Sequence, residues 1–217
     1  MKLTAGKISI ITISTILLID QILKIWIKTH MALYEKTSVL GNWFYINFVE
    51  NNGMAFGMEF GGDFGKLFLS IFRIVAVSGI AYYLYSTIKK GATTGFIICL
   101  SMILAGAIGN IIDSAFYGLI FSDSPEYMPH FKQVAQFLPE SGGYAGFLHG
   151  KVVDMFWFPI LQGHYPGWIP FIGGSEYIFF RPVFNFADSA ISVGIFIIII
   201  FQKKFFPQAD DKSTVSE

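Results

Sequence analysis

Four long runs of apolar residues constrain what this chain can fold into. They cover residues 7–27, 66–88, 94–117 and 183–201, and each is about as long as a helix that crosses the hydrocarbon core of a bilayer, roughly 20 residues. Hydrophobic residues make up 53% of the chain and charged residues only 14%, which is unlike a water-soluble domain. The sequence therefore predicts an all-α integral membrane protein in which residues 1–205 form one bundle of four transmembrane helices.

Lysines beside the apolar runs predict the orientation of the bundle. They form three groups, Lys2 with Lys7, Lys89 with Lys90, and Lys203 with Lys204. All three groups fall on one side of a four-helix bundle, and an excess of lysine marks the cytoplasmic side. We therefore expect both termini in the cytoplasm. We also expect an uncleaved first span, because no small-residue cleavage site follows it, and a disordered cytoplasmic tail over the polar residues 206–217.

Two long segments, residues 28–65 and 118–182, then face outward. Residues 43–46 of the first (Trp-Phe-Tyr-Ile) have strand character. The second is too long for an ordinary connection within a bundle, and a loop of this length usually has a function. Because it is rich in aromatic residues, which favour the headgroup layer, we expect it to lie on the membrane as a long interfacial loop, with residues 155–180 able to act as a lid.

The overall composition excludes other functions. The formal net charge is zero, and without a face rich in lysine and arginine a nucleic-acid partner is not expected. The single cysteine, Cys99, lies inside an apolar run and is expected to pack as a small hydrophobe. The sequence contains no cysteine pair for a disulfide or a metal, and we expect neither a metal nor a cofactor.

Two polar groups inside the predicted helices have both structural and functional interpretations. Asp20 and Lys24 stand four residues apart, so they share a helix face and can pair. The favoured interpretation is an ion pair near the interface, with Lys24 extending outward to solvent; the alternative is a polar wall of an active site. In the third run, Asn110 is expected to form hydrogen bonds between helices, and Asp113 is either a third member of an acidic site or a structural group.

Asp154 and Asp188 are the strongest candidates for chemistry. Each carboxylate stands beside apolar sequence, where a charge costs roughly 2.5–3.5 kcal/mol. Two aspartates brought together in a poorly hydrated site share one proton. The ionised partner can then take a proton from water, while the protonated partner polarises a carbonyl or protonates a leaving nitrogen. The residues alone leave open which two of the four candidate aspartates, Asp20, Asp113, Asp154 and Asp188, meet.

At these positions the chain resembles the bacterial lipoprotein signal peptidase family (signal peptidase II). Five motifs occur in the family's order: Asp20-Gln21 with Lys24, residues 51–56 (Asn-Asn-Gly-Met-Ala-Phe), residues 106–113 with their Gly-Asn core, residues 152–154 (Val-Val-Asp) and residues 184–191 (Phe-Asn-Phe-Ala-Asp-Ser-Ala-Ile). The resemblance implies an aspartic endopeptidase of the bacterial inner membrane, with four helices and an extracytoplasmic β-rich cradle. Its substrates would be diacylglyceryl-modified prolipoproteins, cut before the lipidated cysteine at the periplasmic face.

The resemblance also implies roles for individual residues. Asp154 and Asp188 match the family's catalytic dyad. Seven further residues match positions that line and support that site: Asp20, Lys24, Asn51, Gly106, Asn110, Asn185 and Ala187. Inhibition by the cyclic peptide globomycin and its relatives is expected, as are contact with membrane lipid and a monomeric protein.

Two features of this chain depart from the pattern of the family. Ser114 stands where the family usually has arginine, and Arg73 or Arg181 are candidate replacements. An insert over residues 119–151 separates Asp113 from Asp154.

Two other classes of function are considered. They are a small proton-coupled transporter component, with intramembrane carboxylates as a proton relay, and a non-catalytic scaffold that binds lipoproteins.

Overall fold

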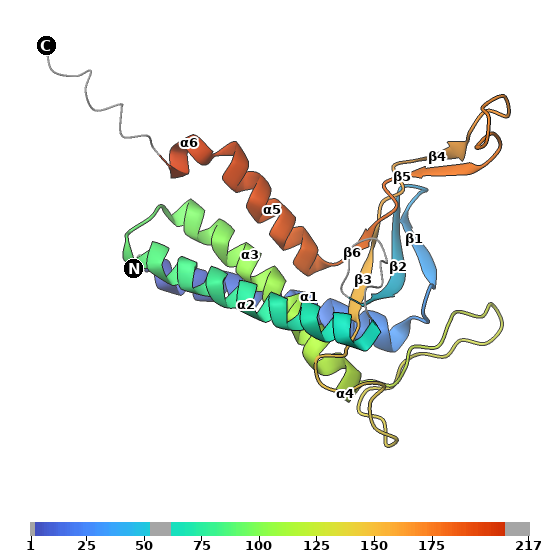
Figure 1. The fold of residues 1–217 in the computed structure, drawn as a ribbon, viewed down its shortest axis with the longest axis horizontal. Coiled ribbons are helices and arrows are strands. Elements are labelled where there is room, and N and C mark those ends of the chain that lie inside the picture. The colour runs from blue at the N-terminus through green and yellow to red at the C-terminus, as the bar shows by residue number, and fades with distance from the viewer. Residues whose placement is uncertain (1–2, 53–61, 207–217) are drawn as a thin grey trace, which may run out of the picture.

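A bundle of helices capped at one end by a small sheet forms the fold (Figure 1). The structure is a computed structural model that describes residues 3–52 and 62–206. Its long helices are α1 (Ala5–His30), α2 (Gly62–Lys89), α3 (Thr94–Ile112) and α5 (Phe186–Ile200). The start of α1 and the short α6 (Gln202–Phe205) lie at the end of the bundle opposite to the sheet. The predicted tail, from residue 207 on, lies outside the described residues.

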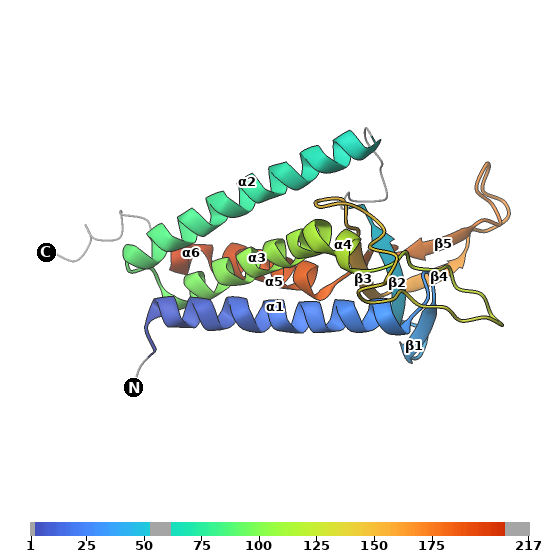
Figure 2. The same cartoon turned by 90° about the horizontal axis from the view of Figure 1, so that it is seen from below.

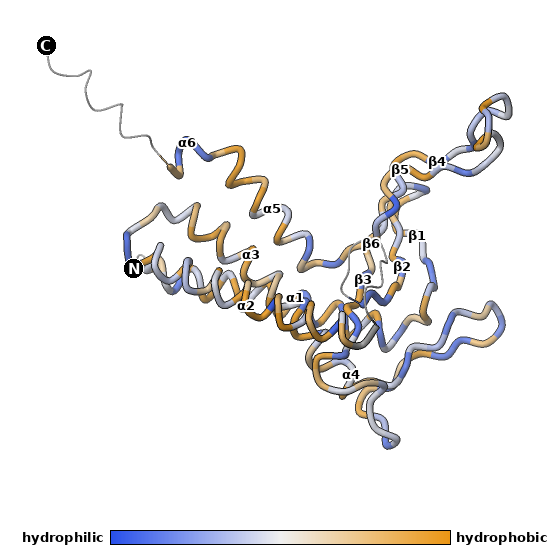
Figure 3. Tube along the Cα trace, in the orientation of Figure 1, coloured by the Kyte–Doolittle hydropathy of each residue, from blue (hydrophilic) through white to orange (hydrophobic). Residues whose placement is uncertain are grey.

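Three helices in the described ranges are long and apolar enough to cross a membrane: Ala5–His30, Phe64–Lys89 and Thr94–Ile120. The third continues α3 through a π-helical turn, η2 (Asp113–Tyr117), and a last turn, α4 (Gly118–Ile120). These spans confirm the first three predicted helices, with ends that differ by a few residues. Hydrophobic residues follow the helices, whereas the insert carries long hydrophilic stretches (Figure 3).

The prediction of a helix over residues 183–201 is wrong at its start. Val183 and Phe184 form strand β6, and α5 has 15 residues, about 22 Å at the usual rise per residue. Asn185 ends the strand and caps the helix, because its side chain accepts a hydrogen bond from Asp188 N while the Asp188 side chain accepts one from Asn185 N. This capping box fixes where the helix begins, and α5 is an apolar helix shorter than the other three.

Helix α3 lies at the centre of the bundle, between α1, α2 and α5 (Figure 2). Two glycines allow its close contacts. A Cβ at Gly106 would lie 2.3 Å from the Ala187 carbonyl oxygen, and one at Gly109 would lie 2.7 Å from Asp20 Oδ2. Cys99 is buried on the same helix, as predicted. Helix α2 diverges from the others toward the sheet, and apolar side chains along it are exposed, among them Phe64, Phe68 and Phe72.

The sheet has the strand order β1-β2-β3-β6, with antiparallel neighbours throughout. Its strands are β1 (Lys36–Leu40), β2 (Phe44–Asn51), β3 (Val152–Trp157) and β6 (Val183–Phe184). Strand β2 confirms the predicted strand for residues 44–46. Strands β2 and β3 come from the two outer segments, and their register places Val49 opposite Asp154 and Asn51 opposite Val152. The sheet therefore joins the two segments beside the helix ends.

The remainder of the second outer segment forms a hairpin and an irregular insert. Strands β4 (Leu161–His164) and β5 (Glu176–Phe179) pair in a separate two-stranded sheet that projects beyond the helix ends (Figures 1 and 2). Residues 119–151 lack a named strand and are mostly exposed, but Phe121 is fully buried in a cluster with Ile27 and Phe48. Phe121 thus fixes the start of the insert to a hydrophobic core of the protein.

Candidate active site

Asp154 and Asp188 come from two elements that meet where the sheet joins the bundle. Asp154 lies in the middle of β3, and Asp188 is the third residue of α5. Strand β6, which pairs with β3 through Phe156 and Phe184, leads directly into the cap of α5. The pairing of these strands therefore brings the first turn of the helix next to Asp154.

Two asparagines link the carboxylates. Asn185 Nδ2 donates to Asp154 Oδ1 at 2.8 Å and to Asn110 Oδ1 at 3.0 Å, and Asn110 Nδ2 donates to Asp188 Oδ1 at 2.8 Å. Asn51 Nδ2 donates to the other Asp154 oxygen, Oδ2, at 3.1 Å. The structure thus brings five predicted site residues into one hydrogen-bonded chain, and each asparagine fixes the direction in which a carboxylate oxygen points.

The environment of Asp154 favours its protonated form. The residue is only 3% exposed, and this burial raises its pKa to about 7, with the nearby Asp188 charge as the second cause. Hydrogen bonds from Asn51 and Asn185 act in the opposite direction. A carboxyl group with a pKa near neutrality can hold a proton at physiological pH and also release it, which general acid catalysis requires.

Lys24 is the centre of a second group, on the bundle side of the dyad. Its Nζ lies 2.9 Å from Asp20 Oδ2 and 2.8 Å from Asp113 Oδ2, and it donates to Asn110 Oδ1 at 2.9 Å. The predicted pair with Asp20 is confirmed, but the expectation that Lys24 extends outward to solvent is wrong. Its side chain is fully buried, because these acceptors use the three donors of an ammonium group.

The contacts of Asp113 favour its interpretation as a structural group. Its carboxylate pairs with Lys24 and accepts hydrogen bonds from Gln21 Nε2 at 3.0 Å and from Val153 N at 3.3 Å. Asp113 therefore ties α1, α3 and β3 together as a structural group. The hydrogen bond from Val153 N fixes the strand residue that directly precedes Asp154.

Asp20 positions the start of α5. Its Oδ1 accepts a hydrogen bond from Ala187 N at 3.0 Å, one of the backbone donors that a helix leaves unpaired in its first turn. Ala187 is fully buried, and Gly106 packs against its carbonyl oxygen. The small residues at these two positions let α3 approach α5 closely enough for Asn110 to reach Asp188.

Sequence reasoning gave no role to two residues around the site, Gln21 and Tyr117. Gln21 bridges Asp20 and Asp113, and Tyr117 donates to Gln21 Oε1 at 3.2 Å. Gln21 could have been found as an uncharged polar residue inside a predicted span. Tyr117 gives no such signal.

Of the two arginines considered in place of the family arginine, Arg73 is the one near the dyad. It is half-buried on α2 and interacts electrostatically with Asp188, Asp154 and Asp113, in that order of strength. Arg181 is exposed, and Ser114 donates to the backbone of its own helix, at Asn110 O.

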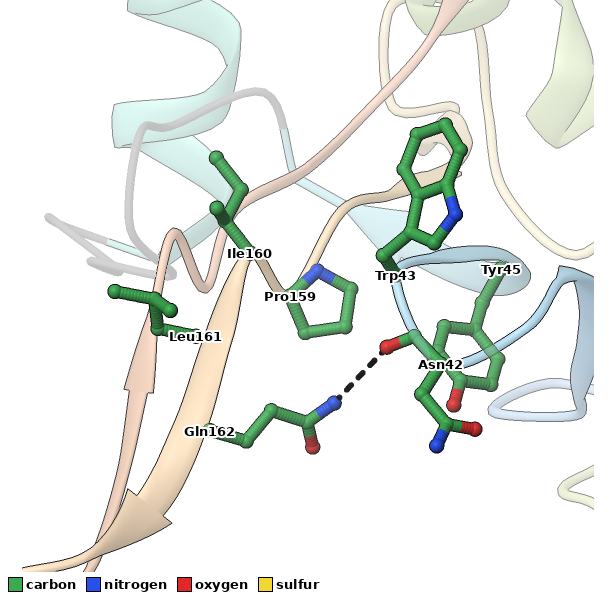
Figure 4. A pocket seen from close by; sticks show the side chains of 7 residues that line it. All are labelled: Asn42, Trp43, Tyr45, Pro159, Ile160, Leu161 and Gln162. Carbon is green, nitrogen blue, oxygen red and sulfur yellow. Dashed lines mark hydrogen bonds between the residues drawn. The ribbon is translucent and has the colours of Figure 1, made fainter.

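A surface pocket that shares no lining residue with this site lies between the β1–β2 turn and the start of the hairpin (Figure 4). Its lining residues are Asn42, Trp43, Tyr45, Pro159, Ile160, Leu161 and Gln162. Gln162 Nε2 donates to Asn42 O across it at 3.2 Å. The pocket is open, and none of its lining residues carries a carboxylate.

Comparison with known proteins yields a consistent family. A family model described as signal peptidase (SPase) II matches residues 12–204. The lipoprotein signal peptidase of Porphyromonas gingivalis is 48% identical over 218 residues, covering all of this chain and 92% of that protein. The lipoprotein signal peptidase of Amoebophilus asiaticus is 34% identical over 202 residues, covering 92% of this chain and 79% of that protein.

Two solved structures share the fold. Both are described as bacterial membrane enzymes, and both superpose with a TM-score of 0.56. The first is 24% identical and covers 90% of this chain and 92% of its own; the second is 23% identical and covers 96% and 94%.

Proposed function

The chain belongs to the signal peptidase II family of aspartic peptidases, and from this premise we propose that it removes signal peptides from diacylglyceryl-modified prolipoproteins by cutting before the lipidated cysteine. One observation carries the proposal for this chain. Asp154 and Asp188, the residues that match the family's dyad, are joined through Asn185 and Asn110 at one end of a bundle of apolar helices. A lipid-anchored substrate lies in the bilayer, so a site at the end of such a bundle suits it.

We propose that Asp154 carries the shared proton and that Asp188 is the ionised base. Burial favours the neutral form of Asp154. Asp188 accepts hydrogen bonds from Asn110 Nδ2 and from Asn185 N, and it lies in the first turn of α5, where the helix dipole favours a negative charge. The two environments push the carboxyl groups toward opposite protonation states, which is the pattern that separates an acid from a base.

The reaction then balances with one water molecule and no covalent intermediate. Asp188 takes a proton from water as the oxygen attacks the scissile carbonyl carbon, and Asp154 gives its proton to the carbonyl oxygen. In the tetrahedral diol that results, Asp188 passes its proton to the leaving nitrogen while one hydroxyl proton returns to Asp154. The C–N bond breaks, and the products are a carboxylic acid and the amine of the lipidated cysteine. Both carboxyl groups regain their starting state.

We also propose the cellular setting predicted from the sequence: a monomer in the inner membrane, with both termini in the cytoplasm, four spans including α5, and the dyad at the periplasmic face, where membrane lipid and globomycin-type inhibitors reach it. The location of Lys89, Lys90, Lys203 and Lys204 at the end of the bundle away from the sheet supports this orientation. The comparisons give no support to a transporter, and the buried aspartates gather near one end of the bundle instead of forming a relay along it.

The direct test uses the purified full-length protein in phospholipid vesicles, with a fluorescent precursor peptide that carries a diacylglyceryl-modified cysteine. We expect cleavage on the amino side of that cysteine and less than about a hundredth of the rate with the unmodified peptide, because the lipid anchor supplies the binding energy that places the bond in the site. Equal rates on both peptides, or binding of the lipidated peptide without turnover, would overturn the proposal.

The dependence of cleavage on pH tests the assignment of the proton. We expect kcat/KM to follow a bell between pH 4 and 9. Activity falls as pH rises through about 7, because the raised pKa of Asp154 means that its proton is lost there, and falls in acid when the second carboxylate is also protonated. The exposed Glu176, replaced by glutamine, is the control and should leave both limbs in place. A rate that climbs steadily from acid to alkali contradicts the shared proton.

A further inference from the structure

A second buried ionic cluster lies beside the candidate active site, and the insert completes it. Lys28 of α1 forms an ion pair with Glu50 of β2, and both side chains are almost fully buried, at 0% and 3% exposure. Ser124 of the insert connects them: Lys28 Nζ donates to Ser124 Oγ at 2.7 Å, and Ser124 Oγ donates to Glu50 Oε1 at 2.7 Å. The dyad chemistry described above uses none of these residues.

The insert encloses this cluster on several sides. Lys28 Nζ lies 4.9 Å from the centre of the Tyr144 ring and 5.4 Å from that of Phe121. Lys151 Nζ lies 3.4 Å from the other Glu50 oxygen, Oε2. Backbone hydrogen bonds from Leu33 N to Pro125 O and from Tyr127 N to Leu33 O, both 2.8 Å, fix the segment around Ser124 to the chain that follows α1. The insert is thus anchored at the junction of α1 and the sheet.

Glu50 of this cluster directly precedes a residue that donates a hydrogen bond to the dyad. Glu50 is followed by Asn51, the last residue of β2, which donates to Asp154 Oδ2 at 3.1 Å. In the register of the sheet, Glu50 lies opposite Val153 and Asn51 opposite Val152. Successive side chains of a strand point to opposite faces, so a fixed Glu50 on one face determines where Asn51 points on the other.

We infer that the insert positions the catalytic carboxylate: Ser124, Lys28 and Glu50 hold the end of β2 so that Asn51 keeps Asp154 in its working orientation. This inference rests on the proposed function of the dyad. An ion pair buried in this way is an expensive way to stabilise a fold, because apolar side chains of similar volume usually serve as well. Its directional hydrogen bonds instead fix the geometry of the strand end, and a misplacement of about 1 Å in a reacting group can cost two orders of magnitude in rate.

Ser124→Ala is the main test variant, because it removes the connecting hydroxyl and leaves both charges. We expect kcat for the lipidated precursor to fall about tenfold, with KM changed less than twofold. We also expect the alkaline limb of the pH–rate profile to move to higher pH, because the Asn51 hydrogen bond holds the pKa of Asp154 down. The charges that act on Asp154, namely Asp188, Lys24 and Arg73, are the same in wild type and variant. Ser124→Thr keeps the hydroxyl and should restore both kcat and the limb.

Lys132→Ala is the matched control within the insert. Lys132 also joins the insert to the rest of the chain, through an ion pair with Glu35 at 2.8 Å, but it is 49% exposed and its partner is not a residue of β2. We expect its kcat and pH profile to match wild type. If Ser124→Ala and Lys132→Ala behave alike, or if Ser124→Ala lowers only the melting temperature, the positioning role is wrong.

A double variant shows whether the effect passes through Asn51. In an Asn51→Ala background, Ser124→Ala should lower kcat no further, because residues that act through one contact are not additive. Fully multiplicative losses would overturn the inference. Failure of the proposed function is distinguishable from this, since wild-type protein would then not cleave the lipidated precursor at all.

Discussion

Replacing Asp154 by asparagine will lower cleavage of a lipidated precursor by about a thousandfold or more, and Asp188→Asn will do the same. Asp154 acts as the acid and Asp188 as the base in the proposed reaction, so neither can substitute for the other. An asparagine at 154 cannot give a proton to the carbonyl oxygen and take it back, and an asparagine at 188 cannot accept one from water. The measurement is single-turnover cleavage in vesicles, where the loss must appear in the chemical step with the precursor still bound.

Thermal unfolding of the same variants separates lost chemistry from lost folding. Because the folded-state pKa of Asp154 is raised to about 7, folded protein keeps a proton that unfolded protein has released. The stability that this proton gives to the folded state is complete below about pH 4 and is lost as pH rises through 7. The free energy of unfolding falls by at most about 1.4 kcal/mol per pH unit. Asparagine resembles the neutral acid and does not titrate. At pH 8 the Asp154→Asn protein should therefore melt no lower than wild type.

Asp123→Asn provides the matched control, because the ion pair of Asp123 with Lys151 is long, at 3.8 Å, and the Asp123 side chain is 78% exposed. A surface ion pair of this kind contributes little to stability, and activity should be unchanged. Cleavage near the wild-type rate by either dyad variant would remove the pair from the mechanism and leave the fold without an assigned acid and base.

The helical part of the fold could be predicted from local sequence patterns, and the error in that prediction has a local cause. Apolar runs of the right length predict α1, α2 and α3 because hydropathy alone determines which segments can cross a bilayer. The start of α5 was misplaced because a long window averages over Asn185. The four residues from Asn185 to Asp188 contain a capping-box signal that identifies the boundary once caps are considered before hydropathy.

The candidate site divides into contacts that the sequence could predict and contacts that only the fold creates. The Asp20–Lys24 pair follows from helical spacing. The third charge, Asp113, lies 89 residues from Lys24 along the chain and is brought there by the packing of α3 against α1. No periodic pattern connects Lys28, Glu50 and Ser124 either, because each comes from a different element. Spacing therefore predicted a partner for Lys24 but not its burial, which requires both carboxylates.

The burial of Lys24 between two carboxylates leads to the second large effect. Lys24→Met leaves Asp20 and Asp113 facing each other in a fully buried place without their cation, because all three side chains are at 0% exposure. Removing one member of a buried ionic group costs roughly 3–5 kcal/mol, a large part of the stability of a small protein. We expect the variant not to accumulate in the membrane, as measured by its level there and by its melting temperature in detergent.

A compensated variant shows whether the charges, rather than the shape of the lysine, cause that loss. Lys24→Met combined with Asp20→Asn and Asp113→Asn has no buried charge left in the group, and an asparagine oxygen at position 20 can still accept the hydrogen bond from Ala187 N. This triple variant should return to near wild-type membrane levels. Its cleavage rate should stay low, because Asn110, which donates to Asp188, loses the hydrogen bond that Lys24 gives it.

Lys132→Met is the matched comparison for Lys24→Met, because both lysines form an ion pair with the same N–O distance. The Lys132–Glu35 pair is as short as the Lys24–Asp113 pair, at 2.8 Å, but Lys132 is 49% exposed, and exposed pairs contribute about 0–1 kcal/mol. Its replacement should change the melting temperature little. If Lys24→Met behaves like Lys132→Met, burial does not determine the energetics of this group, and α1, α3 and β3 must be held together by apolar packing alone.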